Sequence, residues 1–191
     1  MLKTSVLFAT AFTAFALVAG CSTTAPTSMP SDPAAKRHTI DANVDASLNK
    51  LYQQAPATRE LVSKAAGVLV FPSVISAGFV VGGSYGEGAL RKGGHTTGYY
   101  NTAAGSVGLL AGADSKAIFV VFMTEDSYDK FVASKGWTAG ADASVTVVNI
   151  GADGGIDTRT AKQGVAGFVL SNGGLMANLS FDGTKFTRMT L

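Results

Sequence analysis

Glycine is confined to one part of this chain, and its distribution limits the fold more than any other feature. One of the 23 glycines is Gly20, none lies between Cys21 and Ala66, and the other 22 lie between Gly67 and Gly183. Glycine costs about 1 kcal/mol per residue inside a helix. This density therefore excludes a helical bundle and favours strands joined by tight turns. We predict a mainly β region that follows a glycine-free helical one.

Apolar segments within the glycine-rich region mark the expected strands. Residues 118–123 are apolar throughout, which indicates a central strand covered on both faces. Residues 175–181 alternate apolar and polar side chains, which indicates a half-exposed strand, and Asp182-Gly183 offers a hairpin turn into residues 185–190. The expected strands are residues 67–71, ending before Pro72, then 77–81, 106–110, 117–123, 145–150, 165–170 and 175–181.

The glycine-free region between Thr39 and Lys64 has a helical repeat. Apolar side chains recur at i, i+4, i+8 and i+11, and Pro56 ends this helix or separates it from a second short one over residues 57–64. This apolar stripe either packs on the core or forms an amphipathic surface that meets lipid. Its members are Ile40, Val44, Leu48 and Leu51.

One helix is expected to interrupt the strands. Thr124 suits the N-cap, acidic residues follow it in the first turn, and Gly136 suits the C-cap. Tyr128, Phe131 and Val132 share one face of this helix. The expected fold class is therefore α+β: N-terminal helices packed on a glycine-rich, mainly antiparallel β-sheet, sandwich- or barrel-like, with one inserted helix.

Residues 1–20 have the composition of a cleavable export signal. Lys3 is their one charged residue, and the apolar stretch that follows is short for a membrane span. Residues 18–21, Val-Ala-Gly-Cys, resemble a bacterial lipobox, which implies acylation of Cys21 as the first mature residue. Ser22 rather than aspartate follows, which in Gram-negative bacteria implies the outer membrane, facing the periplasm. The alternative is an ordinary secreted protein with a free thiol, because Cys21 is the only cysteine and no internal disulfide can form.

The mature chain is expected to have two parts. Residues 21–38 comprise the acylated cysteine and a flexible tether rich in Ser, Thr, Pro and Ala, in which Pro26, Pro30 and Pro33 oppose regular structure. Residues 39–191 are expected to form a single domain.

A G-x-S-x-G pentapeptide, centred on Ser84, raises the question of a catalytic nucleophile. A nucleophile elbow requires a helix after the serine and a distant histidine. The glycines of residues 86–94 exclude that helix, and the only later histidine, His95, fits the turn of the same hairpin. His38 and His95 also lack companions for a metal site. We therefore predict no catalytic residue, metal or cofactor, and the formal charge of +2 gives no footprint for nucleic acid.

Four blocks of the chain resemble the successive blocks of the SYLF domain. They are residues 67–90 (GVLVFPSVISAGFVVGGSYGEGAL), 98–124 (GYYNTAAGSVGLLAGADSKAIFVVFMT), 136–158 (GWTAGADASVTVVNIGADGGIDT) and 167–189 (GFVLSNGGLMANLSFDGTKFTRM). The resemblance implies a lipid-binding module, associated in eukaryotic members with phosphoinositides and sometimes with actin. It also implies a small exported lipoprotein, as bacterial members commonly are, and it carries no catalytic signature.

The resemblance further implies where lipid is bound. In eukaryotic relatives, lipid contact is attributed to a basic, amphipathic N-terminal part, whose counterpart here is residues 40–64. Export separates the chain from actin, so membrane lipid is the expected partner; the alternative is a structural or adaptor lipoprotein that binds another envelope protein. The candidate lipid contacts are Ile40, Val44, Leu48, Lys50, Leu51, Arg59 and Lys64.

Overall fold

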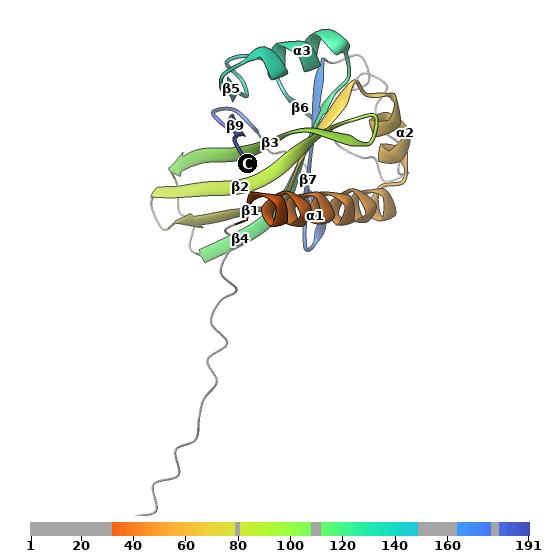
Figure 1. Ribbon diagram of the computed structural model, residues 1–191. Coiled ribbons are helices and arrows are strands. Elements are labelled where there is room, and N and C mark those ends of the chain that lie inside the picture. The colour runs from red at the N-terminus through yellow and green to blue at the C-terminus, as the bar shows by residue number, and fades with distance from the viewer. Residues whose placement is uncertain (1–31, 79–80, 108–111, 149–163, 177–179) are drawn as a thin grey trace, which may run out of the picture.

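The computed structural model has one curled sheet at its centre, with helices on both faces (Figure 1). It describes residues 32–78, 81–107, 112–148, 164–176 and 180–191. The strand order is β5-β9-β3-β2-β1-β4-β7-β6, with β8 paired to β7, and only the β6–β7 pair is parallel among the described strands. The sheet curls into half a barrel, so the predicted α+β class with N-terminal helices is confirmed.

The helices and strands have the following bounds. The helices are α1 (Pro33–Gln54), α2 (Ala57–Lys64) and α3 (Glu125–Ala133). The strands are β1 (Gly67–Gly78), β2 (Val81–Lys92), β3 (His95–Val107), β4 (Gly112–Phe122), β5 (Trp137–Thr138), β6 (Thr146–Val147), β7 (Val165–Ser171), β8 (Gly174–Met176) and β9 (Lys185–Met189).

Each face of the sheet has its own apolar core. On one face, α1 and α2 pack over a cluster that includes Val70 and Phe119. On the other face, α3 packs over an aromatic cluster that includes Phe122 and Trp137, whose rings meet edge to face at 6.4 Å. Alternate residues of β4 point into the two cores, which is why the segment containing it reads as apolar throughout. The predicted central strand is therefore confirmed.

The first helix begins earlier than the sequence predicts. Asp32 caps it by accepting a hydrogen bond from the Ala34 N–H at 2.9 Å, and Pro33 occupies the first helical turn. Proline suits this position because its missing N–H would have no intrahelical partner there. The predicted tether over residues 22–38 is therefore wrong in its last residues, since Pro33 starts the helix instead of opposing it. The predicted break at Pro56 between two helices is confirmed.

The first strand runs further than predicted. It passes through Pro72, where the pairing with both neighbours shifts register, as at a β-bulge. The prediction that the strand ends before Pro72 is wrong because a bulge tolerates the missing N–H. The predicted strand over residues 77–81 is also wrong: Gly78 ends β1, Val81 begins β2, and residues 79–80 lie outside the described part.

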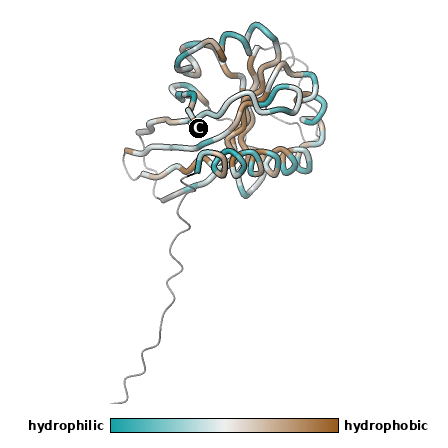
Figure 2. Tube along the Cα trace, viewed as in Figure 1, coloured by the Kyte–Doolittle hydropathy of each residue, from teal (hydrophilic) through white to brown (hydrophobic). Residues whose placement is uncertain are grey.

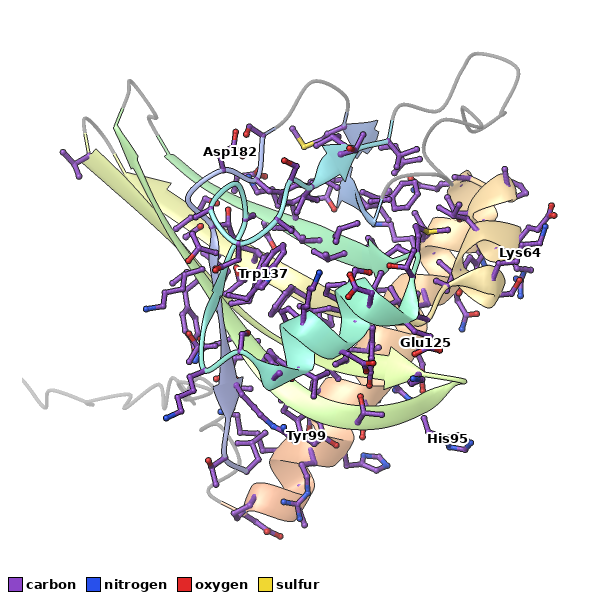
Figure 3. The ribbon with its side chains drawn as sticks, turned by 90° about the horizontal axis from the view of Figure 1, so that it is seen from above. Lys64, His95, Tyr99, Glu125, Trp137 and Asp182 are labelled. Atoms are coloured by element: carbon purple, nitrogen blue, oxygen red, sulfur yellow. The ribbon has the colours of Figure 1, made fainter. Side chains whose placement is uncertain are left out.

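Ser84 lies within the pairing of β2, with Ser76 and Ala104 as its strand partners. It is not at a turn into a helix, so the nucleophile elbow is absent. His95 begins β3 after Gly93 and Gly94, which have φ values of 57° and 83° and form the predicted hairpin turn. It is exposed at that hairpin (Figure 3). Eleven positions separate Ser84 from His95 along the two strands and their turn, so the two residues lie far apart.

Three other predictions change at the C-terminal half. The helix after Thr124 forms with Tyr128 and Phe131 buried, but it ends at Ala133 with Ser134 as the C-cap, not Gly136. The predicted half-exposed strand over residues 175–181 is limited to β8, while residues 177–179 are outside the described part. A turn at Asp182-Gly183 is present, but β9 after it pairs with β3 and β5, so this turn does not close the predicted hairpin.

The remaining strand predictions divide in the same way. The strand predicted over residues 165–170 is confirmed as β7. Of residues 145–150, only β6 is a strand, and residues 149–150 are outside the described part. Of residues 106–110, Ser106 and Val107 end β3, which begins much earlier, at His95. This strand was missed because alanine, serine, threonine and glycine give it no apolar alternation.

Candidate functional site

The predicted apolar stripe of α1 faces the sheet. Val44 and Leu51 are fully buried, and Ile40 is 7% exposed, all within the core between α1 and the sheet. Leu48 is partly buried against the same cluster. Of the two readings left open by the sequence, the structure therefore favours core packing for this stripe, since buried side chains cannot reach a lipid surface.

The cationic residues predicted as lipid contacts lie in the last part of the helical region, near the end of α1 and in α2. Lys50, Arg59 and Lys64 are exposed, and Figure 3 shows Lys64 at the periphery of the molecule. The Arg59 guanidinium lies 4.5 Å from the centre of the Tyr52 ring, and Lys64 Nζ pairs with Glu60 at 2.6 Å. The structure thus leaves these three cations in contact with solvent, and their role in lipid binding stays a prediction.

A groove of about 410 Å³ lies between this helical region and the β2–β3 hairpin. Tyr52 and Arg59 line it from the helices, and Gly93 and Gly94 line it from the turn. These lining residues show that the end of α1 and the start of α2 lie beside the hairpin turn.

A charged cluster fastens α1 to the sheet. The guanidinium of Arg91 lies 2.9 Å from Asp45 Oδ1 and 3.4 Å from Asp41 Oδ1. Asp41 also accepts hydrogen bonds from the Thr96 hydroxyl at 2.7 Å and the Tyr99 hydroxyl at 2.8 Å. The side chain of Arg91 is only 12% exposed. Because Asp41 is bonded from three directions, this cluster fixes the helix on the β2–β3 hairpin, and Figure 3 shows Tyr99 beside α1.

Tyr99 is expected to make this attachment sensitive to alkali. Burial, and then the hydrogen bond and charge of Asp41, raise the pKa of Tyr99 from 10.0 to about 12. Since the folded state holds this proton more tightly, the stabilisation is complete below pH 10.0 and is lost as the pH rises through about 12. Urea unfolding at a series of pH values should show wild type losing stability over this interval more steeply than Tyr99→Phe. Equal pH slopes for the two proteins would contradict this prediction.

A second surface, unpredicted from the sequence, lies where the strands extend beyond the helices (Figure 1). We define the projecting strand end as residues 73–78, 81–86, 102–107 and 112–115 of β1 to β4. Three large apolar side chains in it are exposed: Val81 by 71%, Ile75 by 58% and Tyr85 by 49%. Ile75 and Tyr85 are directly paired across β1 and β2, and Val81 is on the same face as Tyr85. These three side chains lie on one face of the projecting strand end, which we call the patch.

The patch continues the sheet face that α1 covers. Lys36, in the first turns of α1, pairs with Glu87 of β2 at 2.8 Å, and the Tyr85 hydroxyl donates to the same carboxylate at 2.9 Å. Burial, followed by the hydrogen bond to Glu87, raises the pKa of Tyr85. The start of α1 therefore lies at the border of the projecting strand end, and polarity along β2 changes there from charged to apolar.

Among residues 32–78, 81–107, 112–148, 164–176 and 180–191, no group of three His, Cys, Asp or Glu side chains converges as a metal site would require. In the same part of the chain, no helix is long and apolar enough to cross a bilayer. The fold and its surfaces define an α+β domain with a curled, glycine-rich sheet and one exposed apolar sheet end.

Comparison with protein families agrees with that class. Residues 103–190 match the family Ysc84, described as Las17-binding protein actin regulator. This match is to the SYLF domain and is consistent with a member of the SYLF domain family, which confirms the resemblance drawn from the sequence. The family is a lipid-binding one. No curated protein matches the chain.

The matched region does not include the candidate helices. It covers part of β3, all of the strands that follow, and α3. The first of the four SYLF-like blocks, residues 67–90, lies outside it, as do α1 and α2. The projecting strand end falls partly inside the matched region, through β3 and β4, and partly outside it, through β1 and β2.

Proposed function

We propose that this chain is an exported bacterial lipoprotein, acylated at Cys21, whose SYLF domain binds membrane lipid and acts by binding instead of catalysis. The observation that carries the proposal is the family match over residues 103–190. The signal-like residues 1–20 and the lipobox-like residues 18–21 support export and anchoring, and Ser22 supports the outer membrane, facing the periplasm. Two or more acyl chains hold a protein stably on a bilayer, since each buried methylene contributes about 0.8 kcal/mol.

Co-flotation with liposomes tests lipid binding directly. Residues 22–191, expressed without acylation, should float with vesicles of phosphatidylethanolamine and phosphatidylglycerol, and mass spectrometry of the protein processed in cells should find Cys21 acylated. A chain that floats with no lipid composition, anionic or neutral, would overturn the lipid-binding proposal. An unmodified Cys21 in the processed protein would overturn the anchoring while leaving lipid binding to be judged by flotation.

The helical region is expected to contribute only weakly to binding of anionic lipid. Its cations exceed its carboxylates by one, since Lys36, Arg37, Lys50, Arg59 and Lys64 stand against Asp32, Asp41, Asp45 and Glu60. One excess charge near an anionic surface is worth about 1 kcal/mol, or about fivefold in affinity.

Replacing Lys50, Arg59 and Lys64 together by glutamine therefore tests the lipid contact predicted from the sequence. Three charges at the surface would together contribute about 3 kcal/mol, or more than 100-fold in affinity. We expect the triple variant to bind anionic vesicles no more than about fivefold more weakly than wild type, because the exposed apolar patch lies at the other end of the domain, and the difference should vanish in high salt. Flotation across a salt series measures both quantities. A loss of about 100-fold would instead assign the lipid contact to these three residues.

A second function, that of an envelope adaptor, is favoured by the open edges of the sheet. Among the described residues, the pairing of β3 with β9 ends at Ala103, and the pairing of β4 with β7 begins at Ala117. Beyond these positions β3 and β4 each have one described neighbour, so their outer edges offer backbone groups to another strand. Crosslinking to one envelope protein, unaffected by lipid composition, would support this function.

A further inference from the structure

The exposed apolar side chains of this protein gather at one place. Among the described residues, Ile75, Val81 and Tyr85 are the large apolar side chains with high exposure, and all three belong to the projecting strand end. Chance scatter over the surface would not place two of them opposite one another on paired strands and the third on the same face. Exposed apolar side chains that gather on one face are typical of an interaction site, so we expect a partner to cover this patch.

Charge is almost absent from the same part of the chain. Residues 73–86 and 102–113 contain no Asp, Glu, Lys, Arg or His, and the one charged residue of the projecting strand end, Asp114, pairs with Ser76 and therefore lies on the sheet face opposite to Ile75. Figure 2 shows β1 and β2 there in mainly white to brown, whereas the outer side of α1 is teal. A protein partner usually brings polar contacts at the rim of its interface, whereas the bilayer strongly disfavours charge. The absence of charge from the face that holds Ile75, Val81 and Tyr85 therefore fits a lipid surface.

Polarity changes along β2 in the order that a bilayer boundary requires. Val81 is at the end of the strand, Tyr85 follows about 13 Å further along, and Glu87 with its partner Lys36 follows about 20 Å from Val81. Aromatic rings with a polar hydroxyl prefer the boundary between lipid and water. An apolar tip, a tyrosine and then an ion pair match the acyl, interfacial and headgroup levels.

The position of the chain that precedes α1 adds a geometric reason. Asp32 caps the helix about one turn before Lys36, which pairs with Glu87 at the border of the projecting strand end, and Cys21 precedes Asp32 by 11 residues. A coil of that length has a root-mean-square span of about 17 to 20 Å. This is close to the distance of about 20 Å from Glu87 to Val81. An anchor at Cys21 would therefore hold this end of the sheet, and not α2, at the membrane.

The opposite end of the helical region lies too far away to share the contact. Along β2, Arg91 is ten residues from Val81, about 33 Å, and it lies beside Asp45, well along α1. Electrostatic attraction is screened over about 8 Å at physiological ionic strength. The charge of Lys64 is therefore too far from a bilayer in contact with Val81 to be attracted by its anionic headgroups.

From these observations we infer that the projecting strand end, through Val81, Ile75 and Tyr85, is the surface with which the domain contacts the phospholipid bilayer. The inference rests on the proposed function and specifies which surface carries it. The contact is interfacial in depth. Among the described residues, β3 beyond Ala103 and β4 before Ala117 each have one strand neighbour, and the acyl region cannot satisfy backbone groups on an open edge, whereas an interfacial segment is buried by about 5–10 Å at the boundary of headgroups and acyl chains.

Two tryptophan substitutions, made one at a time, distinguish the two ends of the molecule. The mature chain is coupled through Cys21, its only cysteine, to a maleimide phospholipid in vesicles of phosphatidylethanolamine and phosphatidylglycerol with brominated acyl chains. Val81→Trp reports on the projecting strand end, and Lys64→Trp is the matched exposed control on α2. The native Trp137 is only 4% exposed, so wild type supplies a constant background. We expect a blue shift and bromine quenching at position 81 and neither at position 64.

Each result has a defined meaning. Quenching at position 64 without quenching at 81, or quenching at neither, overturns the inference. A blue shift at 81 without bromine quenching also overturns it, because the patch is then covered by another protein copy. In flotation of the uncoupled residues 22–191, Val81→Asp should bind about tenfold more weakly, while Ala46→Asp on the exposed side of α1 binds like wild type.

The inference and the proposed function fail separately. If residues 22–191 float but tryptophan at position 81 stays unquenched, lipid binding stands and the assigned surface is wrong. If they do not float but the coupled chain shows quenching at position 81, the surface is right and the affinity depends on the anchor. Because Val81 is exposed, its substitution does not disturb the core, and thermal unfolding of each variant verifies this.

Discussion

Gly88→Ala is expected to lower the stability of the fold strongly. Gly88 lies in β2 opposite the β-bulge of β1, where the backbone of Val70 and the ring of Phe71 close over it. A methyl group there would meet the Val70 carbonyl oxygen well inside 3.0 Å and the Phe71 ring at 2.8 Å. Backbone atoms cannot yield as a flexible side chain does, so we expect a loss of about 4 kcal/mol or more. A domain of ordinary stability, about 5–15 kcal/mol, would keep about 1–11 kcal/mol and should unfold at a much lower urea concentration than wild type.

A neighbouring glycine supplies the control. Gly83 lies in the same strand, has no positive φ, and an added Cβ would have its nearest contact, the Ala104 carbonyl oxygen, at 3.9 Å. Gly83→Ala should therefore unfold in urea like wild type or be more stable by about 0.4–1 kcal/mol, because the unfolded chain loses freedom. Circular dichroism during urea unfolding measures both variants. Equal stability of the two variants would show that the bulge relaxes around a side chain.

Val44→Asp is the second change expected to have a large effect. Val44 is fully buried between α1 and the sheet, so the substitution puts a carboxylate into an apolar core without a partner. We expect a loss of about 4 kcal/mol, and vesicles should not restore it, because the side chain faces protein. Urea unfolding with and without vesicles measures this effect.

Ala46→Asp adds the same charge to the exposed side of the same helix. It should change stability by no more than about 1 kcal/mol, most of it from helix propensity. If Val44→Asp instead folded normally and lost only its binding to vesicles, the apolar stripe of α1 would be the lipid contact predicted from the sequence, and the packing described above would not hold in solution.

The sequence was most informative where local rules and tertiary packing agree. The glycine boundary at Gly67, the break at Pro56 and the apolar strand over residues 117–123 correspond to the observed division into helices and sheet. The stripe of Ile40, Val44 and Leu51 was visible as a stripe, but a helical repeat shows only that one face is apolar. Whether that face meets protein or lipid depends on what lies opposite, and here it is the sheet.

The projecting strand end was missed for a different reason. Exposure of Ile75 and Val81 arises because β1 and β2 extend past the helix that covers the same face, and strand length relative to a helix is a tertiary property. One signal was available in the sequence: residues 73–86 and 102–113 contain no charged side chain. The cluster of Asp41, Arg91 and Tyr99 left no such signal, because its members are about 50 residues apart and meet only when α1 docks on the hairpin.

By itself, the sequence determined that a helical region precedes a glycine-rich sheet and which family the chain resembles, since these follow from backbone preference, side-chain periodicity and residue order. Only the tertiary structure decided which apolar residues are buried and which stay exposed. Burial depends on the element packed opposite. For β1 and β2 that element is α1, which begins only at Pro33, one turn before the Lys36–Glu87 pair, so the end of β1 and the start of β2 stay uncovered.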